Sequence, residues 1–259
     1  MKTHGAAVST FSDWWNYKME VVDAIPYNAY IMQKVGLNVA INSDDAEMAR
    51  RLNQEAAKIV KYGGINELDA WKMVTINPAK MLHVNAKVGS VKVGKDADLV
   101  IWSDNPLSIY AKAEKTMVDG IIYFDRDKDA AMRKLNQAEK VRLVQKLAAA
   151  KRTAGPGGAA GMQRARPRLE VIHACGDHNH DHLLPFTNGV AQETISPKKK
   201  KKETIALTNA TIHVGNGQVI SNGTVVLKNG KITEVSTTAS TAGARVINCN
   251  GKHIYPGLI

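Results

Sequence analysis

Residues 88–107 have the sequence VGSVKVGKDADLVIWSDNPL, and this stretch marks a change from helix-like to strand-like sequence. Two strand-like runs lie on either side of a Gly94-Lys95-Asp96 turn, and the second run, Asp98–Trp102, is nearly all apolar. A short apolar run bounded by turn residues is typical of a buried strand. We therefore expect a sheet to begin here.

Further strand signals follow on both sides of a long gap in the chain. Residues 115–124, KTMVDGIIYF, predict a hairpin, because Asp119-Gly120 tolerates the positive φ values of a type I′ turn. Residues 204–235 carry Asn-Gly pairs between alternating or apolar runs. We expect a meander of about four strands there, with turns at Asn216-Gly217, Asn222-Gly223 and Asn229-Gly230.

The residues before position 89 have the pattern of alternating helices and strands. GLNVAIN, at 36–42, is an apolar run of strand length, and residues 43–64 have helical periodicity that ends at Gly63-Gly64. The apolar positions that recur in this helix are Met48, Leu52, Ala56 and Ile59. Residues 66–76 predict a second helix, Pro78 suits the first turn of a third, and residues 127–152 predict a long helix with a ragged apolar stripe.

Composition and charge limit the function classes. The chain has 259 residues, of which 44% are hydrophobic and 23% charged, as in globular proteins. Its start has no signal-peptide pattern, and no apolar stretch is long enough to span a bilayer. Its two cysteines weakly favour a reducing compartment. A cytoplasmic location is therefore the default expectation. Residues 140–202 contain thirteen Lys or Arg against four acids, which gives +9 of the net +11. We interpret this basic segment as a solvated linker and expect no specific nucleic-acid partner, since it offers one aromatic residue for base stacking.

The clearest candidate for chemistry is Asp44 in VAINSDD, residues 39–45. A carboxylate that directly follows a strand in an α/β layer lies where such folds place catalytic groups, and it can bind a metal or accept a proton. Ser43, Asp44 and Asp45 also suit the start of a helix as capping residues. Both interpretations remain open from these residues alone.

A second, separate metal site is conceivable in HACGDHNHDH, at 173–182. This run brings together His173, Cys175, His178, His180 and His182. Imidazole and thiolate are ligands for zinc or copper, but the spacing matches no standard structural zinc site. An adventitious weak site is the favoured interpretation.

Several of these segments resemble the amidohydrolase superfamily. The resemblance to its closing segment lies in VGSVKVGKDADLVIWSDNPL, VDGIIYF and the preceding NPAKML. The resemblance to its opening segment lies in residues 206–235 and GKHIYPGLI (251–259). STFSDWWNYKMEVVDAIPYNA (9–29) with NSDD is similar to the imidazolonepropionase-like branch. The resemblance implies a metal-dependent TIM-like barrel beside a small β-sandwich, and hydrolysis of non-peptide carbon–nitrogen bonds in a small amide-type substrate.

The order of the resembling segments implies a fragment. The closing segment stands before the opening one, as expected where two tandem units join. Of the metal residues of the superfamily only the last-strand aspartate is matched, at Asp44, where the resemblance implies a ligand of a zinc-class ion that also shuttles a proton. One carboxylate cannot hold a catalytic metal, so we expect the isolated chain to be inactive.

The resulting fold class is α/β plus β: a partial TIM-like barrel with a composite β-sandwich. We expect a barrel part (1–88), sandwich strands (89–124), a helix (125–152), a basic flexible linker (153–202) and opening-type sandwich strands (203–259). Residues 89–124 and 204–247 are predicted to pair across the linker, because loop-closure cost grows only logarithmically with length. The alternative function is a non-catalytic β-sandwich module whose basic linker adheres to polyanions. The sequence sets no oligomeric state.

Overall fold

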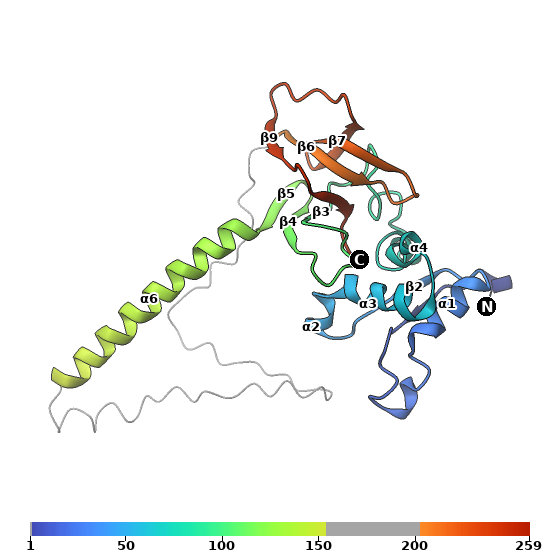
Figure 1. Cartoon of the computed structure of the whole chain (residues 1–259), viewed down its shortest axis with the longest axis horizontal. Helices are drawn as coiled ribbons and strands as arrows, with labels where there is room; N and C mark the ends of the chain where they lie inside the picture. Colours follow the sequence, from blue (N-terminus) through green and yellow to red (C-terminus); the bar gives the residue numbers. More distant parts are fainter. Residues whose placement is uncertain (1, 154–202) are drawn as a thin grey trace. The chain divides into compact units, whose positions relative to one another are not determined.

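The computed structural model describes residues 2–153 and 203–259. The chain divides into two compact units, Met1–Asp129 with Lys201–Ile259 and Ala130–Lys200. The predicted histidine-rich run, the linker and the lysine run at 198–202 lie outside the described residues. The first unit is a mixed α/β structure with two sheets (Figure 1).

The residues before position 88 form a small parallel sheet with short helices. Its strands are β1 (Val8–Thr10) and β2 (Val39–Ile41), which pair in parallel with Thr10 opposite Ile41. The remaining elements are η1 (Lys2–His4), η2 (Met19–Val21), α1 (Pro26–Lys34), α2 (Ala46–Ala49), α3 (Leu52–Lys58), the π-helix η3 (Ile59–Gly63), α4 (Glu67–Lys72) and α5 (Ile76–Met81). β2 is the predicted apolar strand and is buried at all three residues.

The helix predicted over 43–64 is interrupted rather than continuous. α2 ends at Ala49, Arg51 has φ −120° and ψ 22°, and α3 begins at Leu52. α3 turns polar as well as apolar residues inward, since Asn53 Nδ2 donates to the Pro106 carbonyl at 2.6 Å and Glu55 accepts a hydrogen bond from the Ser12 hydroxyl. Apolar periodicity cannot show such a buried polar face. The predicted stop is confirmed, because Gly64 is left-handed with φ 75°.

The second sheet joins strands from two distant parts of the sequence. The strands before the long helix α6 (Arg126–Thr153) are β3 (Leu99–Trp102), β4 (Ala113–Val118) and β5 (Ile121–Asp125). The described strands after it are β6 (Ile205–His213), β7 (Val219–Lys228), β8 (Lys231–Ser236), β9 (Arg245–Asn248) and β10 (His253–Pro256). The strand order is β5-β4-β3-β10-β6-β7-β8, with β9 beside β6. β3 pairs antiparallel with β10, from His253↔Trp102 to Pro256↔Leu99. The two strand sets therefore share one sheet, whose green and red strands meet in Figure 1, but the strand that joins them is β10 at residues 253–256 and not one within the predicted range 204–247.

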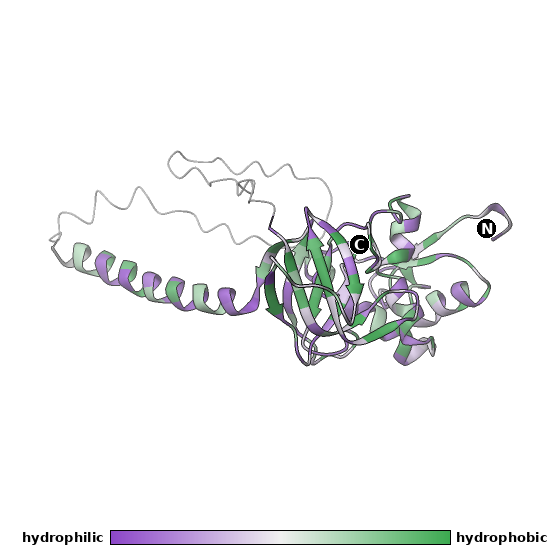
Figure 2. Cartoon of the chain, turned by 90° about the horizontal axis from the view of Figure 1, so that it is seen from above, coloured by the Kyte–Doolittle hydropathy of each residue, from purple (hydrophilic) through white to green (hydrophobic). Residues whose placement is uncertain are grey.

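Both strand sets contribute to one hydrophobic core. Its buried residues come from the earlier strands, from the later strands and from the segments beside them, and they include Leu99, Ile101, Met117, Leu207, Ile212, Val225, Leu227 and Ile254. A second core surrounds β2, α3 and α4 and also takes in Val100, Trp102 and Tyr255 from β3 and β10. One face of β3 and β10 thus packs in the core of the sheet, and the other face packs against the helical part. Figure 2 shows the apolar colouring of the sheet strands.

Two predicted hairpin turns are confirmed, whereas one predicted turn and one predicted strand are wrong. Asp119-Gly120 and Asn229-Gly230 form tight turns with all four φ values positive. Asn222-Gly223 is not a turn: it lies inside β7, where Gly223 pairs with Ala210. The run before Gly94 is a loop rather than a strand, because its backbone is held by bonds such as Val91 N to the Val214 carbonyl at 3.0 Å.

The helix predicted over 127–152 is confirmed as α6, which carries hydrophobic and hydrophilic residues in alternation along its length (Figure 2). Within residues 2–153 and 203–259, no helix combines the length and the apolar character needed to cross a membrane.

Candidate functional site

Asp44 lies just beyond the carboxyl end of β2, where the sequence predicts it. Because β1 and β2 are parallel, their carboxyl ends meet at one edge, and Asn42 N donates to the Thr10 carbonyl at 3.1 Å. Asp44 is exposed and has φ 52°, the left-handed conformation. A non-glycine residue in this region is strained, although aspartate tolerates it better than most. The edge therefore presents a carboxylate in an energetically unfavourable conformation.

The capping role belongs to the neighbouring carboxylate. Asp45 is the N-cap of α2, and its Oδ1 accepts from Glu47 N at 2.8 Å and from Met48 N at 2.9 Å. Two backbone donors that the helix leaves unpaired are thereby satisfied. The structure thus assigns the cap to Asp45, one of the three capping candidates that the sequence offers.

Asp44 borders an open hollow of about 690 Å³ at this edge. Its walls come from the ends of β1 and β2, from α5 and from the last two residues of the chain; the lining residues are Ser9, Ala40, Ile41, Asn42, Ser43, Asp44, Ala49, Leu52, Pro78, Met81, Leu82, Leu258 and Ile259. Ile259 N donates to the Val74 carbonyl at 3.0 Å, which holds the GKHIYPGLI segment against the helical part. Asn42 Oδ1 is buried at this edge and has no hydrogen-bond partner among the described residues.

The described residues do not form a complete metal centre. Within residues 2–153 and 203–259, no group of three or more His, Cys, Asp or Glu side chains is close enough to share an ion. A catalytic zinc site needs three protein ligands. Asp44 is one potential donor, and the described residues bring no set of three ligands together around it. His173, Cys175, His178, His180 and His182 lie outside the described residues.

A partly buried ionic cluster supports the loop after β1. Lys58 Nζ donates to Asp13 at 2.7 Å and to both carboxylate oxygens of Glu55 at 2.9 Å, and Glu55 also accepts from Ser12. Burial lowers the pKa of Lys58, but the hydrogen bonds to Asp13 and Glu55 outweigh it and raise that pKa above its usual value. The cluster ties the loop to α3 beneath the carboxyl edge. No spacing in the sequence signals it.

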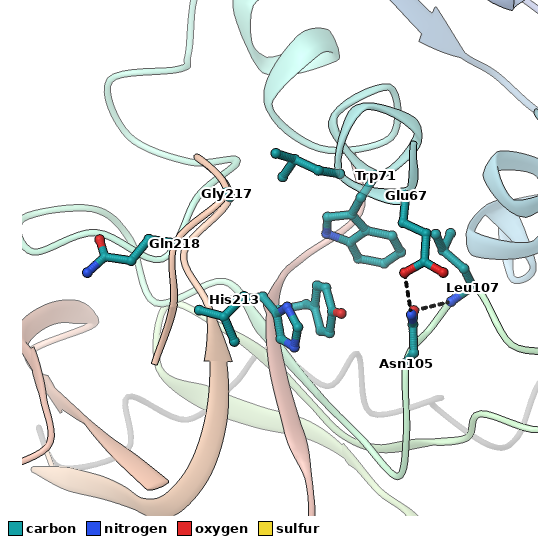
Figure 3. Close-up of a pocket in the computed structure, with 11 residues that line it drawn as sticks. Glu67, Trp71, Asn105, Leu107, His213, Gly217 and Gln218 are labelled. Atoms are coloured by element: carbon teal, nitrogen blue, oxygen red, sulfur yellow. Dashed lines mark hydrogen bonds between the residues drawn. The ribbon is translucent and has the colours of Figure 1, made fainter. Parts of the chain in front are cut away.

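A second pocket, which the sequence does not predict, lies between α4 and the later strands (Figure 3). It has a volume of about 280 Å³ and shares no lining residue with the hollow at Asp44. Its walls come from distant parts of the chain and include Glu67, Trp71, Asn105, His213 and Tyr255. Because His213 and His253 occur at ordinary strand positions, no sequence signal pointed to them.

Comparison with known families gives an independent view of the chain. Residues 28–149, from α1 to α6, match the model described as the amidohydrolase family. This region contains β2, Asp44 and the first strands of the composite sheet. The match agrees with the resemblance in NPAKML and VGSVKVGKDADLVIWSDNPL.

Curated relatives carry compatible names. The chain is 32% identical to amidohydrolase tasK of Hapsidospora irregularis over 120 residues, and 38% identical to a 5-methylthioadenosine/S-adenosylhomocysteine deaminase of Thermoanaerobacter pseudethanolicus over 80 residues. The alignments cover 46% and 27% of this chain, but they span only 12% and 19% of the lengths of these relatives. A solved amidohydrolase from Thermotoga maritima MSB8 is 34% identical over 42% of this chain and 28% of its own, with a TM-score of 0.39.

Proposed function

We propose that the chain is part of a metal-dependent amidohydrolase that hydrolyses non-peptide carbon–nitrogen bonds of a small molecule, with Asp44 as its functional carboxylate. The observation that carries this proposal is the left-handed Asp44 at the carboxyl edge of β2, beside an open hollow. The family match over residues 28–149 and the names of the two relatives support it.

The conformation of Asp44 favours a role in function over a role in stability. A strained residue persists where the surrounding structure holds it, and such residues cluster at functional sites. Asp44 is exposed, and the capping bonds of α2 are made by Asp45 instead. A carboxylate in this position can ligate a divalent cation or accept a proton.

The metal itself sets a limit on what this chain does. A zinc-class ion would supply a Lewis acid, but the described residues bring no group of three ligands together to hold it. These residues therefore do not fit a catalytic ion by themselves. Catalysis requires further ligands from outside the described residues, and we expect no hydrolysis by residues 2–153 and 203–259 alone.

The same proposal includes the family branch, the fold and the organisation of the chain. We propose the imidazolonepropionase-like branch and a partial TIM-like barrel with a β-sandwich. We also propose that the chain is divided after residues 88, 124, 152 and 202, and that it joins the closing segment of one unit to the opening segment of a second unit. The support for these features is the order of the resembling segments and the direct pairing of β3 with β10.

Substitution of the two neighbouring acids tests the proposed role of Asp44. Asp44→Gly is expected to leave the free energy of unfolding unchanged or to raise it by up to about 1 kcal/mol, because glycine adopts φ 52° without strain. Asp45→Ala, the matched control, is expected to lower it by about 1 kcal/mol through loss of the cap. Chemical denaturation measures both. If Asp44→Gly destabilises the protein as much as Asp45→Ala, Asp44 is a structural carboxylate and the proposal fails.

A further inference from the structure

The pocket between α4 and the later strands, here named the aromatic pocket, is built from four separate segments. α4 contributes Glu67, Leu68 and Trp71, the loop after β3 contributes Asn105 and Leu107, and β10 contributes Tyr255. The end of β6, the following turn and the start of β7 contribute His213, Gly215, Gly217, Gln218 and Val219. Glu67 and Trp71 are four residues apart on a helix, so they share one face.

Three rings form one wall of the aromatic pocket. Tyr255 and His213 are stacked with centroids 4.0 Å apart and an interplanar angle of 11°, and Trp71 meets Tyr255 edge to face at 5.0 Å. Trp71 is 3% exposed, and its Nε1 has no hydrogen-bond partner in the part of the chain that the structure describes. In Figure 3 the indole nitrogen points to the side of the pocket where His213 lies. Electron-rich ring faces attract cations.

The charge of the aromatic pocket is negative. Among the described residues that line the pocket, Glu67 is the one acidic side chain, and none is lysine or arginine. Burial and the neighbouring His253 lower the pKa of His213 to about 4, so its ring is neutral at physiological pH. Burial, with Glu67 and Asp104 nearby, raises the pKa of Tyr255, which keeps the phenol protonated.

The Glu67 carboxylate is held in place. Asn105 Nδ2 donates to Glu67 Oε2 at 2.8 Å, and Asn105 Oδ1 accepts from Leu107 N at 3.1 Å (Figure 3). The asparagine is thereby fixed from both ends of its amide. Glu67 Oε1 makes no hydrogen bond within the described residues and is available to a ligand.

The turn between β6 and β7 also lines the aromatic pocket. Gly217 has φ 101°, a conformation that favours glycine, and a Cβ at this position would lie 3.2 Å from Leu68 Cδ2. A side chain here would therefore be strained and would press on α4. Gln218 N donates to Asn216 Oδ1 at 2.9 Å, which fixes the turn.

We propose that the aromatic pocket binds a small organic monocation, whose ammonium group lies between the Glu67 carboxylate and the rings of Trp71, Tyr255 and His213. The volume of about 280 Å³ is at the lower end of the range for ligand pockets, which favours a small ligand. The site is separate from the hollow at Asp44, so this proposal does not depend on the proposed hydrolase function.

Choline and its uncharged isostere 3,3-dimethylbutan-1-ol are the probes that test this proposal on the full chain. The NMR signal of the Trp71 indole N–H, assigned with Trp71→Phe, is followed during each titration. Choline is expected to shift this signal to saturation, and the isostere is expected to bind about tenfold more weakly, because a desolvated cation–π contact contributes roughly 1–2 kcal/mol. Equal affinity for the two probes, or no shift with choline, overturns the proposal.

Two variants and a control locate the site. Glu67→Gln is expected to weaken choline binding by about threefold without changing the affinity for the isostere, since it removes one exposed charge. Glu47→Gln on α2 is the control and is expected to change neither. Val219→Phe, at a half-exposed lining position, is expected to block both probes by filling the pocket. Unchanged choline binding in Val219→Phe, or an equal loss in Glu47→Gln, places the cation elsewhere and contradicts the proposal.

Discussion

At the residue scale, the two histidines of the later strands show how burial sets protonation. His213 Nε2 lies 3.1 Å from His253 Nδ1, and the His213 ring is covered by Tyr255. A proton on His213 would have to be accommodated in this partly buried stack beside a second imidazole. This is the physical cause of its lowered pKa.

The lowered pKa predicts a pH dependence of stability. The unfolded chain binds a proton at this histidine below pH about 6.5, whereas the folded chain does so only near pH 4. The contribution of His213 to stability is therefore complete above pH 6.5 and is lost as the pH falls from 6.5 toward 4. His213→Asn is expected to flatten the decline in unfolding free energy between pH 6.5 and 5, and denaturant titrations measure it.

His83 provides the control for this experiment. It is exposed, and its left-handed φ of 57° is one that asparagine also tolerates. His83→Asn should therefore keep the slope of the wild-type protein. A slope that is identical in the wild type and in His213→Asn would contradict the assigned role of His213.

At the element scale, the pairing of β6 with β7 depends on two irregularities that compensate each other. Between Leu207 and Ala210, β6 has one residue more than its partner, and between Ala210 and Ile212 the extra residue is on β7. Asn209 and Asn222 occupy these places with φ values of 60° and 53°. The two bulges cancel, so the pairing continues in register toward both ends.

This arrangement explains why the Asn222-Gly223 prediction is wrong. Asn-Gly specifies a left-handed backbone, which both a hairpin turn and a bulge can use. The deciding factor is the partner strand, which lies on the other side of residue 218 and is not visible in local sequence. Asp119-Gly120 was predictable because its two strands adjoin the turn directly.

Gly223 gives a quantitative test of the bulge. A Cβ at this position would lie 2.5 Å from Ile212 Cδ1 and 2.9 Å from Ile220 Cγ2. Since Ile212 is fully buried, Gly223→Ala is expected to lower the unfolding free energy by about 1–3 kcal/mol through overpacking. Adding Ile212→Val, which deletes the clashing methyl group, should recover part of this loss. A double-mutant cycle with additive effects would show that the two groups do not collide.

At the scale of the whole molecule, the composite sheet is the main structural result. Sequence patterns predicted most of its strands. The expected pairing of residues 89–124 with 204–247 is replaced by a ladder between β3 and β10, at residues 253–256, which joins the two strand sets in one sheet. The shape of the pocket at Trp71 could not be predicted, since its walls are separated by up to about 190 positions and meet only in the folded chain. The Asp44 position was predictable because a strand end and a helix start are both local signals.

The composite sheet predicts that the chain holds together after cleavage. A protease site inserted between residues 153 and 203 breaks the connection from α6 to β6 but leaves the β3–β10 ladder and the shared core. The two pieces are expected to elute together in gel filtration, because each alone would expose apolar surface and unpaired edges. Separate elution under native conditions would contradict the composite sheet.

The central functional claim is that Asp44 is one donor of a metal centre that the described residues leave incomplete. The direct measurement is zinc content after dialysis against a weak chelator, in a chain whose residues His173, Cys175, His178, His180 and His182 are replaced so that they contribute no ligands. The account predicts no stoichiometric zinc and no change on Asp44→Ala. One tightly held zinc per chain that is lost on Asp44→Ala would contradict it.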